Sequence, residues 1–120
     1  MIKFVMCITR HASMTREQFR EYWEKQHGPY FMKNADKMGA KRYVQGHTMN
    51  TPLNEGLRAS RDMRPAYDGV AEVWFDSEES LMAGMSTPEG MELGAALLED
   101  ERNFIDHSKS TAFIVEEVEF

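Results

Sequence analysis

The sequence is poor in cysteine. Cys7 is the single cysteine among 120 residues, so the chain forms no internal disulfide and has no paired-cysteine metal motif. The four histidines lie far apart, without the HxH or HxxxH spacing of a metal site. We therefore expect a reducing, cytoplasmic setting, no metal ion and no cofactor. Cys7 itself is read as a small buried hydrophobe rather than a nucleophile.

Long apolar runs and glycine-rich loops are missing too. No stretch approaches the roughly 20 apolar residues that a membrane-spanning helix needs. The first residues, MIKFVMCITRH, lack the basic segment, long apolar run and cleavage site of a secretion signal. Neither a phosphate loop nor a dinucleotide fingerprint occurs. We expect no membrane partner and no targeting segment.

A positive net charge is also absent, because the chain carries −6 overall. Residues 1–60 hold ten basic and five acidic side chains, whereas residues 61–120 hold four and fifteen. Nucleic-acid binding without sequence preference depends on a basic surface, so this acidic chain is a poor candidate for it. The basic half can attract a small anion, although a solvated face is the simpler interpretation.

Local patterns predict one domain over residues 1–120, since 42% hydrophobic content suffices for a single core. Thr15 and Gln18 form a capping box, which starts a helix at Thr15. We expect that helix to break or bend at His27-Gly28-Pro29, because proline lacks a backbone donor. A second helical piece then runs to about Gly39, a C-cap.

The remaining pattern alternates strands and helices. Residues 2–10, 41–49, 68–76 and the C-terminal stretch STAFIVEEVEF have strand character. Asp76 or Ser77 caps one helix, and Thr87-Pro88-Glu89 starts another. Residues 50–67 show no periodicity and are read as a lid or a mobile excursion. Within that excursion, a helical turn with one basic face can form from three arginines, Arg58, Arg61 and Arg64.

The resulting order, βαββαβ, predicts an α+β, ferredoxin-like fold with a four-stranded antiparallel sheet. Helices cover one face of such a sheet, yet both faces are apolar here. We expect one side to hold Val5, Cys7, Val73, Phe75, Phe113 and Val115, and the other Phe4, Met6, Val70, Trp74, Ile114 and Val118. A second copy of the chain can cover the open face, so we expect a homodimer.

The strongest candidate site lies where the first helix ends. Phe19, Trp23 and His27 recur at a spacing of four, which places an imidazole beside an aromatic wall. His27 can act as a general acid or base in a pocket formed by Trp23 and Tyr30. The alternative is a histidine at a helix end that hydrogen-bonds backbone carbonyls.

Tyr43 and His47 share one face of their strand, at about 7 Å separation. Tyr43 can donate a hydrogen bond to a carbonyl or enolate oxygen while His47 moves a proton. The alternative is that both are half-buried in the dimer interface. His11 is read as loop surface, and the Asp106-His107 pair as solvated rather than as part of the pocket.

Four segments carry a family resemblance. They are Phe19-x-x-Tyr22-Trp23-x-x-x-His27-Gly28-Pro29, YVQGH at 43–47, DGVAEVWFDS at 68–77 and NFIDHS at 103–108. With these segments the chain resembles the EthD family of the dimeric α+β barrel superfamily. That resemblance implies a pocket between the sheet and the helices, lined by His27, Tyr43 and His47.

We therefore hypothesise a homodimeric, cofactor-independent acid–base enzyme of the dehydratase, cyclase or isomerase type, acting on a small apolar oxygenated or aromatic metabolite. His27 and His47 share the acid and base roles, Tyr43 polarises an oxygen, and Trp23, Tyr30 and Trp74 shape the pocket. One alternative is a non-catalytic accessory protein that binds a hydrophobic metabolite. Another is a cofactor-free or haem-using monooxygenase, since the wider superfamily includes such enzymes.

Overall fold

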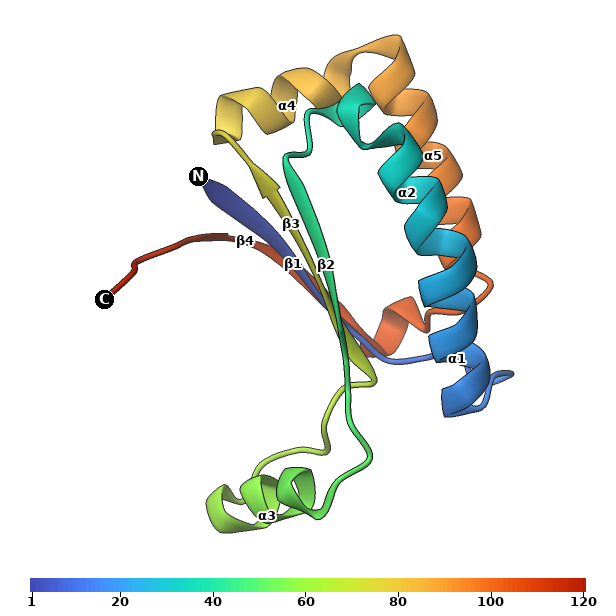
Figure 1. Cartoon of the computed structure of the whole chain (residues 1–120), viewed down its shortest axis with the longest axis vertical. Coiled ribbons are helices and arrows are strands. Elements are labelled where there is room, and N and C mark those ends of the chain that lie inside the picture. The colour runs from blue at the N-terminus through green and yellow to red at the C-terminus, as the bar shows by residue number, and fades with distance from the viewer.

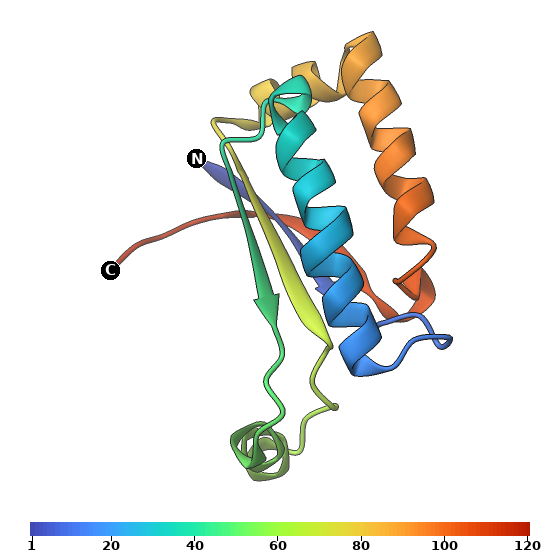
Figure 2. The ribbon, with the colours of Figure 1, turned by 45° about the vertical axis from the view of Figure 1, so that its right-hand side comes forward.

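The sheet of the computed structural model, which describes residues 1–120, has four antiparallel strands in the order β2-β3-β1-β4 (Figure 1). The strands are β1 (Ile2–Ile8), β2 (Arg42–His47), β3 (Gly69–Phe75) and β4 (Thr111–Glu116). All helices except α3 lie over one face of this sheet (Figure 2). The predicted ferredoxin-like α+β fold is therefore confirmed.

The first helical segment is continuous where a break or bend was predicted. It runs through α1 (Arg16–Tyr22), the π-helix η1 (Trp23–His27), α2 (Gly28–Asn34) and the 3₁₀ turn η2 (Ala35–Met38). The Gly28 amide donates to the Trp23 carbonyl, five residues back, and this wide turn places Pro29 in the first turn of α2. A missing amide proton costs little there, so proline changes the helix type without ending the helix.

Local capping signals fix the other helix boundaries. The Thr15–Gln18 capping box is present, and Gly39 ends η2 with φ 80°. Ser77 and Thr87 cap α4 (Glu78–Ser86) and α5 (Pro88–Glu101). The short 3₁₀ helix η3 (His107–Lys109) then leads into β4. None of the helices has the length and apolar content needed to cross a membrane.

The segment 50–67 contains a helix, α3 (Pro52–Arg61), capped by Thr51. It projects beyond the end of the sheet as an arm, and none of its residues is buried (Figure 1). Arg58 and Arg61 belong to this helix, whereas Arg64 follows it. The reading of residues 50–67 as a stretch without periodicity was wrong, because α3 is amphipathic. Leu53 and Leu57 share one of its faces, and both are exposed because the helix has no core to pack against.

The register of the sheet corrects the predicted division of its two faces. Phe4 pairs with Val73, and Val5 with Glu72, so Phe4 and Val73 face the helices while Val5 lies on the open face. The prediction had placed Val73 and Phe75 with Val5, and Val70 and Trp74 with Phe4. A shift of one residue inverts a strand's faces, and the isolated sequence of β3 does not fix its partner.

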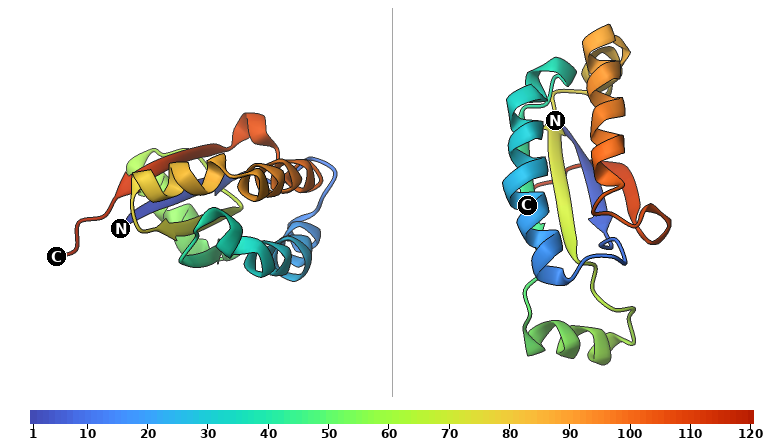
Figure 3. Two further views of the ribbon diagram at one scale, coloured as in Figure 1. Left: turned by 90° about the horizontal axis from the view of Figure 1, so that it is seen from above. Right: turned by 90° about the vertical axis from the view of Figure 1, so that its right-hand side faces the viewer.

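The helix layer lies over one face of the sheet (Figure 3). Two clusters of buried apolar side chains pack between these two layers. Phe31 and Val73 belong to the cluster near α4 and α5, whereas Phe19, Trp23 and Phe104 belong to the cluster near the start of α1. On α5, Leu93 and Leu97 are buried, whereas Met91 and Leu98 are exposed.

The open face of the sheet is more polar than expected. The Lys3 ammonium lies 2.7 Å from a carboxylate oxygen of Glu72, and the Trp74 indole donates to Glu117 at 2.7 Å. The Arg42 guanidinium stacks over the Trp74 ring, 4.6 Å from its centre. Apolar side chains such as Phe113 remain exposed beside this charged cluster.

Candidate functional site

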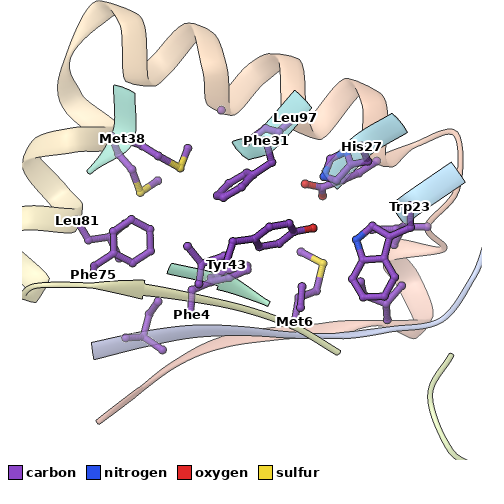
Figure 4. Close-up of a pocket in the computed structure, with 18 residues that line it drawn as sticks. Phe4, Met6, Trp23, His27, Phe31, Met38, Tyr43, Phe75, Leu81 and Leu97 are labelled. Carbon is purple, nitrogen blue, oxygen red and sulfur yellow. The ribbon is translucent and has the colours of Figure 1, made fainter. Parts of the chain in front are cut away.

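A cavity of ≈ 480 Å³ lies between the sheet and the helix layer (Figure 4). Of its 18 lining residues, 15 are hydrophobic, and the other three are His27, Gly94 and Glu101. Met38, Phe75 and Leu81 gather at one end of the view, and the Tyr43 hydroxyl points toward Trp23 and His27 at the other. The cavity therefore has an apolar end and a polar end, which is typical of a small-molecule site.

At the polar end, His27 is held by a carboxylate from the last turn of α5. The Nδ1 atom of His27 lies 2.6 Å from Oδ2 of Asp100, and the His27 side chain is only 8% exposed. The ring also packs on Phe104, with 4.9 Å between the ring centres. These contacts fix both the position and the plane of the imidazole at the cavity wall.

The protonation of this pair follows from its hydrogen bonds. Burial raises the pKa of the Asp100 carboxyl, but hydrogen bonds from Tyr22 and His27 outweigh it and hold the pKa below its usual value. An ionised carboxylate only accepts, so the Nδ1 atom of His27 must donate to it. In neutral His27 the lone pair is then on Nε2, which is the tautomer of a general base.

A second set of hydrogen bonds orients Tyr43. Gln45 Nε2 donates to the Trp23 carbonyl at 2.9 Å and to the Tyr43 hydroxyl oxygen at 2.7 Å. Burial is the main cause that raises the pKa of the Tyr43 phenol, so the phenol stays protonated at neutral pH. Because its oxygen accepts from Gln45, the Tyr43 proton is free to be donated into the cavity.

His47 completes this set from outside the cavity. Its Nε2 atom lies 2.9 Å from Oε1 of Gln45, and its ring packs 4.8 Å from that of Trp23. Since Gln45 Oε1 can only accept, His47 Nε2 carries the proton, and the buried Nδ1 atom has no partner. Burial lowers the pKa of His47 and favours the neutral imidazole.

The Glu101 carboxylate reaches from the cavity toward the surface. Glu101 lines the cavity, and its Oε1 atom lies 3.0 Å from Nε2 of His107. The Glu101 side chain is 17% exposed and that of His107 is 39% exposed. Asp106, next to His107, caps η3 instead of entering the site, so the expectation that Asp106 stays outside the pocket agrees with the structure.

The structure brings only some of the predicted site residues together. His27, Tyr43 and Trp23 line the cavity, whereas His47 reaches it through Gln45. Trp74 lies on the open face of the sheet and Tyr30 is 41% exposed on α2, so neither shapes the cavity. Trp74 was predicted on the wrong face because the register of β3 was not known. Tyr30 was predicted in the cavity because the helix was expected to break or bend before it.

Sequence reasoning missed Asp100, Glu101, Tyr22 and Gln45. Asp100 and Glu101 belong to an acidic run, Glu99 to Glu101, that reads as a solvated helix end. Gln45 lies between Tyr43 and His47 on the same strand face, and this period-two spacing was the one available signal. No three histidine, cysteine or acidic side chains are placed so that they could hold a metal ion.

Comparison with known proteins gives the family. A model of the EthD domain matches residues 11–108 of this chain. The chain belongs to the EthD family. No curated protein sequence matches it. An EthD family protein from Bacillus halodurans has a similar structure, with a TM-score of 0.65 and 21% identity over 98% of this chain and 99% of the other.

Two further solved structures share the fold of this EthD domain. A mutant form of SnoaB, a cofactor-independent oxygenase from Streptomyces nogalater, matches with a TM-score of 0.56 and 13% identity over 99% of this chain and 94% of the other. A dimeric ferredoxin-like protein of unknown function from Thermobifida fusca matches with a TM-score of 0.59 and 15% identity, over 95% and 88%. At these identities the likeness establishes the fold.

Proposed function

We propose that this EthD protein is a cofactor-independent acid–base enzyme that moves a proton on a small, apolar, oxygenated or aromatic metabolite. The observation that carries the proposal is the Asp100–His27 pair at the wall of an otherwise apolar cavity. A carboxylate that fixes the tautomer of a buried imidazole is the arrangement of a general base. The apolar lining of the cavity strengthens charge interactions in the site.

The chemistry divides between two side chains. His27 Nε2 takes a proton from a carbon next to a carbonyl group. The electron pair of the broken C–H bond forms a carbon–carbon double bond, and the π pair of the carbonyl group moves onto its oxygen. Tyr43 donates its hydroxyl proton in a hydrogen bond to that oxygen and stabilises the enolate. Return of the proton to a different carbon completes an isomerisation, and its transfer to a departing hydroxyl group completes a dehydration.

His47 has a positioning role in this proposal instead of a direct one. It holds Gln45 through Nε2, and Gln45 in turn holds Tyr43. His47 is absent from the cavity lining, so the sharing of acid and base roles between two histidines is replaced by one base, His27, and one hydrogen-bond donor, Tyr43.

Hydrogen exchange on a simple carbon acid tests the proposal without knowledge of the natural substrate. We choose 2-tetralone, an uncharged bicyclic ketone, in D₂O and follow loss of the proton signal beside its carbonyl by NMR. The wild-type protein should accelerate exchange above the buffer rate. His27→Gln should lower that acceleration at least about a hundredfold, the scale for loss of a general base.

The matched control is His11→Gln, which changes an imidazole bonded to Ser13 in the surface loop. It should exchange the probe at the wild-type rate. If His27→Gln does so too, the assignment of the base is wrong. Saturable binding of 2-tetralone by the wild type without any exchange would instead favour the accessory binding protein.

We further infer that this single domain works as a homodimer through the open sheet face, and in the cytoplasm. Two observations support the dimer: Phe113 is exposed on that face, and the ferredoxin-like protein from Thermobifida fusca that shares this fold is dimeric. Light scattering on the eluting protein should give twice the mass of one chain, and Phe113→Lys should give a monomer. Met63→Lys, an equally exposed change after the α3 arm, should leave the dimer intact. A monomeric wild type would refute the dimer.

A further inference from the structure

The polar end of the cavity carries a negative side chain and no positive one. Glu101 is the single carboxylic acid among the lining residues, and the lining contains neither lysine nor arginine. Its charge is close enough to Tyr43 to contribute to the raised pKa of that phenol. A ligand that brings its own negative charge to this end meets repulsion and finds no cation to neutralise it.

The Glu101 carboxylate is also held in place. His107 Nε2 lies 3.0 Å from one of its oxygens, at the surface side of the cavity wall. Asp106 fixes the turn that presents His107, because its side chain accepts from the Ser108 amide. The carboxylate therefore does not swing freely into solvent when a ligand enters.

The hydrogen-bonding groups at this end match one kind of functional group. Tyr43 offers a proton, since its oxygen already accepts from Gln45. Glu101 only accepts, and His27 in its neutral form accepts through Nε2. A hydroxyl group can both donate to an acceptor and accept from Tyr43, whereas a carboxylate can only accept.

We propose that Glu101 makes this cavity selective for uncharged rings that bear a hydroxyl group, and excludes rings that bear a carboxylate in the same place. This specificity role uses the same cavity as the proposed function but does not require turnover. The apolar end receives the ring system, and ≈ 480 Å³ leaves room for two fused rings or more.

The experiment compares two ligands of equal ring size, 2-naphthol and 2-naphthoate, at pH 7. The chain has two tryptophans, so Trp74→Phe leaves Trp23, in the cavity wall, as the sole tryptophan whose emission reports binding. Equilibrium dialysis with the unaltered chain repeats the comparison without that substitution. 2-Naphthol should quench Trp23 saturably and bind at least about tenfold more tightly than 2-naphthoate.

The decisive variant is Glu101→Gln, which keeps the length of the side chain and removes its charge. This variant should reduce the difference in affinity between 2-naphthol and 2-naphthoate to less than about threefold, mainly because 2-naphthoate binds better. Glu99→Gln is the matched control, since Glu99 is 76% exposed and pairs with Arg102 outside the cavity. Glu99→Gln removes the same charge from the same helix and should leave the difference in affinity between the two ligands unchanged.

Three outcomes overturn the proposal. The first is that the wild type binds 2-naphthoate as tightly as 2-naphthol or more tightly. The second is that Glu101→Gln keeps the wild-type difference in affinity between the two ligands. The third is that 2-naphthol does not bind at concentrations up to about 1 mM, at which even weak sites fill. The result is separate from the test of catalysis. Ligand selection can hold while His27→Gln exchanges 2-tetralone normally, and exchange can depend on His27 while both naphthalenes bind alike.

Discussion

The side-chain amide of Gln45 donates a hydrogen bond to the phenol oxygen of Tyr43, at 2.7 Å. The backbone carbonyl of Trp23 can only accept, so it fixes which end of the Gln45 amide carries the hydrogens. The π-helical turn thus determines, through one side chain, which way the Tyr43 proton points.

Gly28→Ala should disturb this relationship from the helix side. An added Cβ would lie 2.8 Å from Gln45 Nε2, closer than van der Waals contact allows, so the amide must move away from Tyr43. We expect the 2-tetralone exchange rate to fall about tenfold or more, because the donor to the enolate is no longer oriented. Gly56→Ala, with open space around its Cβ, serves as control. Wild-type exchange in Gly28→Ala would show that Gln45 does not orient the site.

Asp100→Asn should invert the tautomer of His27. The Asn oxygen accepts from Tyr22, so its amide group donates to His27 Nδ1 and the proton moves to Nε2, which can no longer act as a base. Exchange should fall by about 10² to 10⁴, and nitrogen NMR should report a protonated Nε2. Tyr22→Phe keeps the Asp100–His27 hydrogen bond and should retain most of the rate. An Asn variant with wild-type exchange would contradict the assigned base.

His47 should make the protein less stable as the pH falls below neutrality. Burial lowers its folded pKa below the unfolded value of about 6.5, so the unfolded state binds more protons between those two values. Stability then rises with pH across this window and is fully gained above about pH 6.5.

Urea unfolding of the wild type and of His47→Gln, from pH 8 to pH 4.5, measures this dependence. The difference between the two free energies of unfolding should change across the window below about pH 6.5 and be flat above it. A difference that is constant over the whole range would show that His47 titrates alike in the folded and unfolded states.

Gly69→Ala should destabilise the fold through Trp23. The new Cβ would lie 2.6 Å from Cζ3 of the Trp23 ring and 3.0 Å from the Gly46 carbonyl, so either the indole or the strand must shift. Overpacking of this kind costs about 1–3 kcal/mol in the free energy of unfolding. In urea unfolding, Gly56→Ala in the exposed α3 helix should instead gain about 0.5–1 kcal/mol. Equal midpoints for wild type and Gly69→Ala would refute the tight contact.

Features that depend on neighbouring residues could be predicted from the sequence. The Thr15–Gln18 capping box, the left-handed Gly39 and the caps at Ser77 and Thr87 are all short-range, and all are present. Tyr43 shares its strand face with Gln45, as period two requires. These elements were enough to give the order of strands and helices and thus the fold.

Only part of the candidate site could be predicted from the sequence, because its other residues are brought in by contacts between segments far apart in the chain. His27 and Asp100 are 73 residues apart, and nothing local to either residue marks the other as its partner. Trp74 was misplaced for a related reason, since the face of a central strand depends on its register with strands elsewhere in the chain. Pro29 was interpreted as a helix end, although a wider turn before it also accommodates the missing donor.

The π-helical turn at Trp23–His27 determines which mutations this segment can accept during evolution. A π turn holds one residue more than the α turn it replaces, so loss of one residue there would restore an ordinary helix. Because the wide turn itself absorbs that extra residue, α1 and α2 would keep their rotation relative to each other after the deletion. A single-codon deletion would instead remove the turn in which the Trp23 carbonyl accepts from both Gly28 and Gln45, and with it the orientation of the Tyr43 hydroxyl.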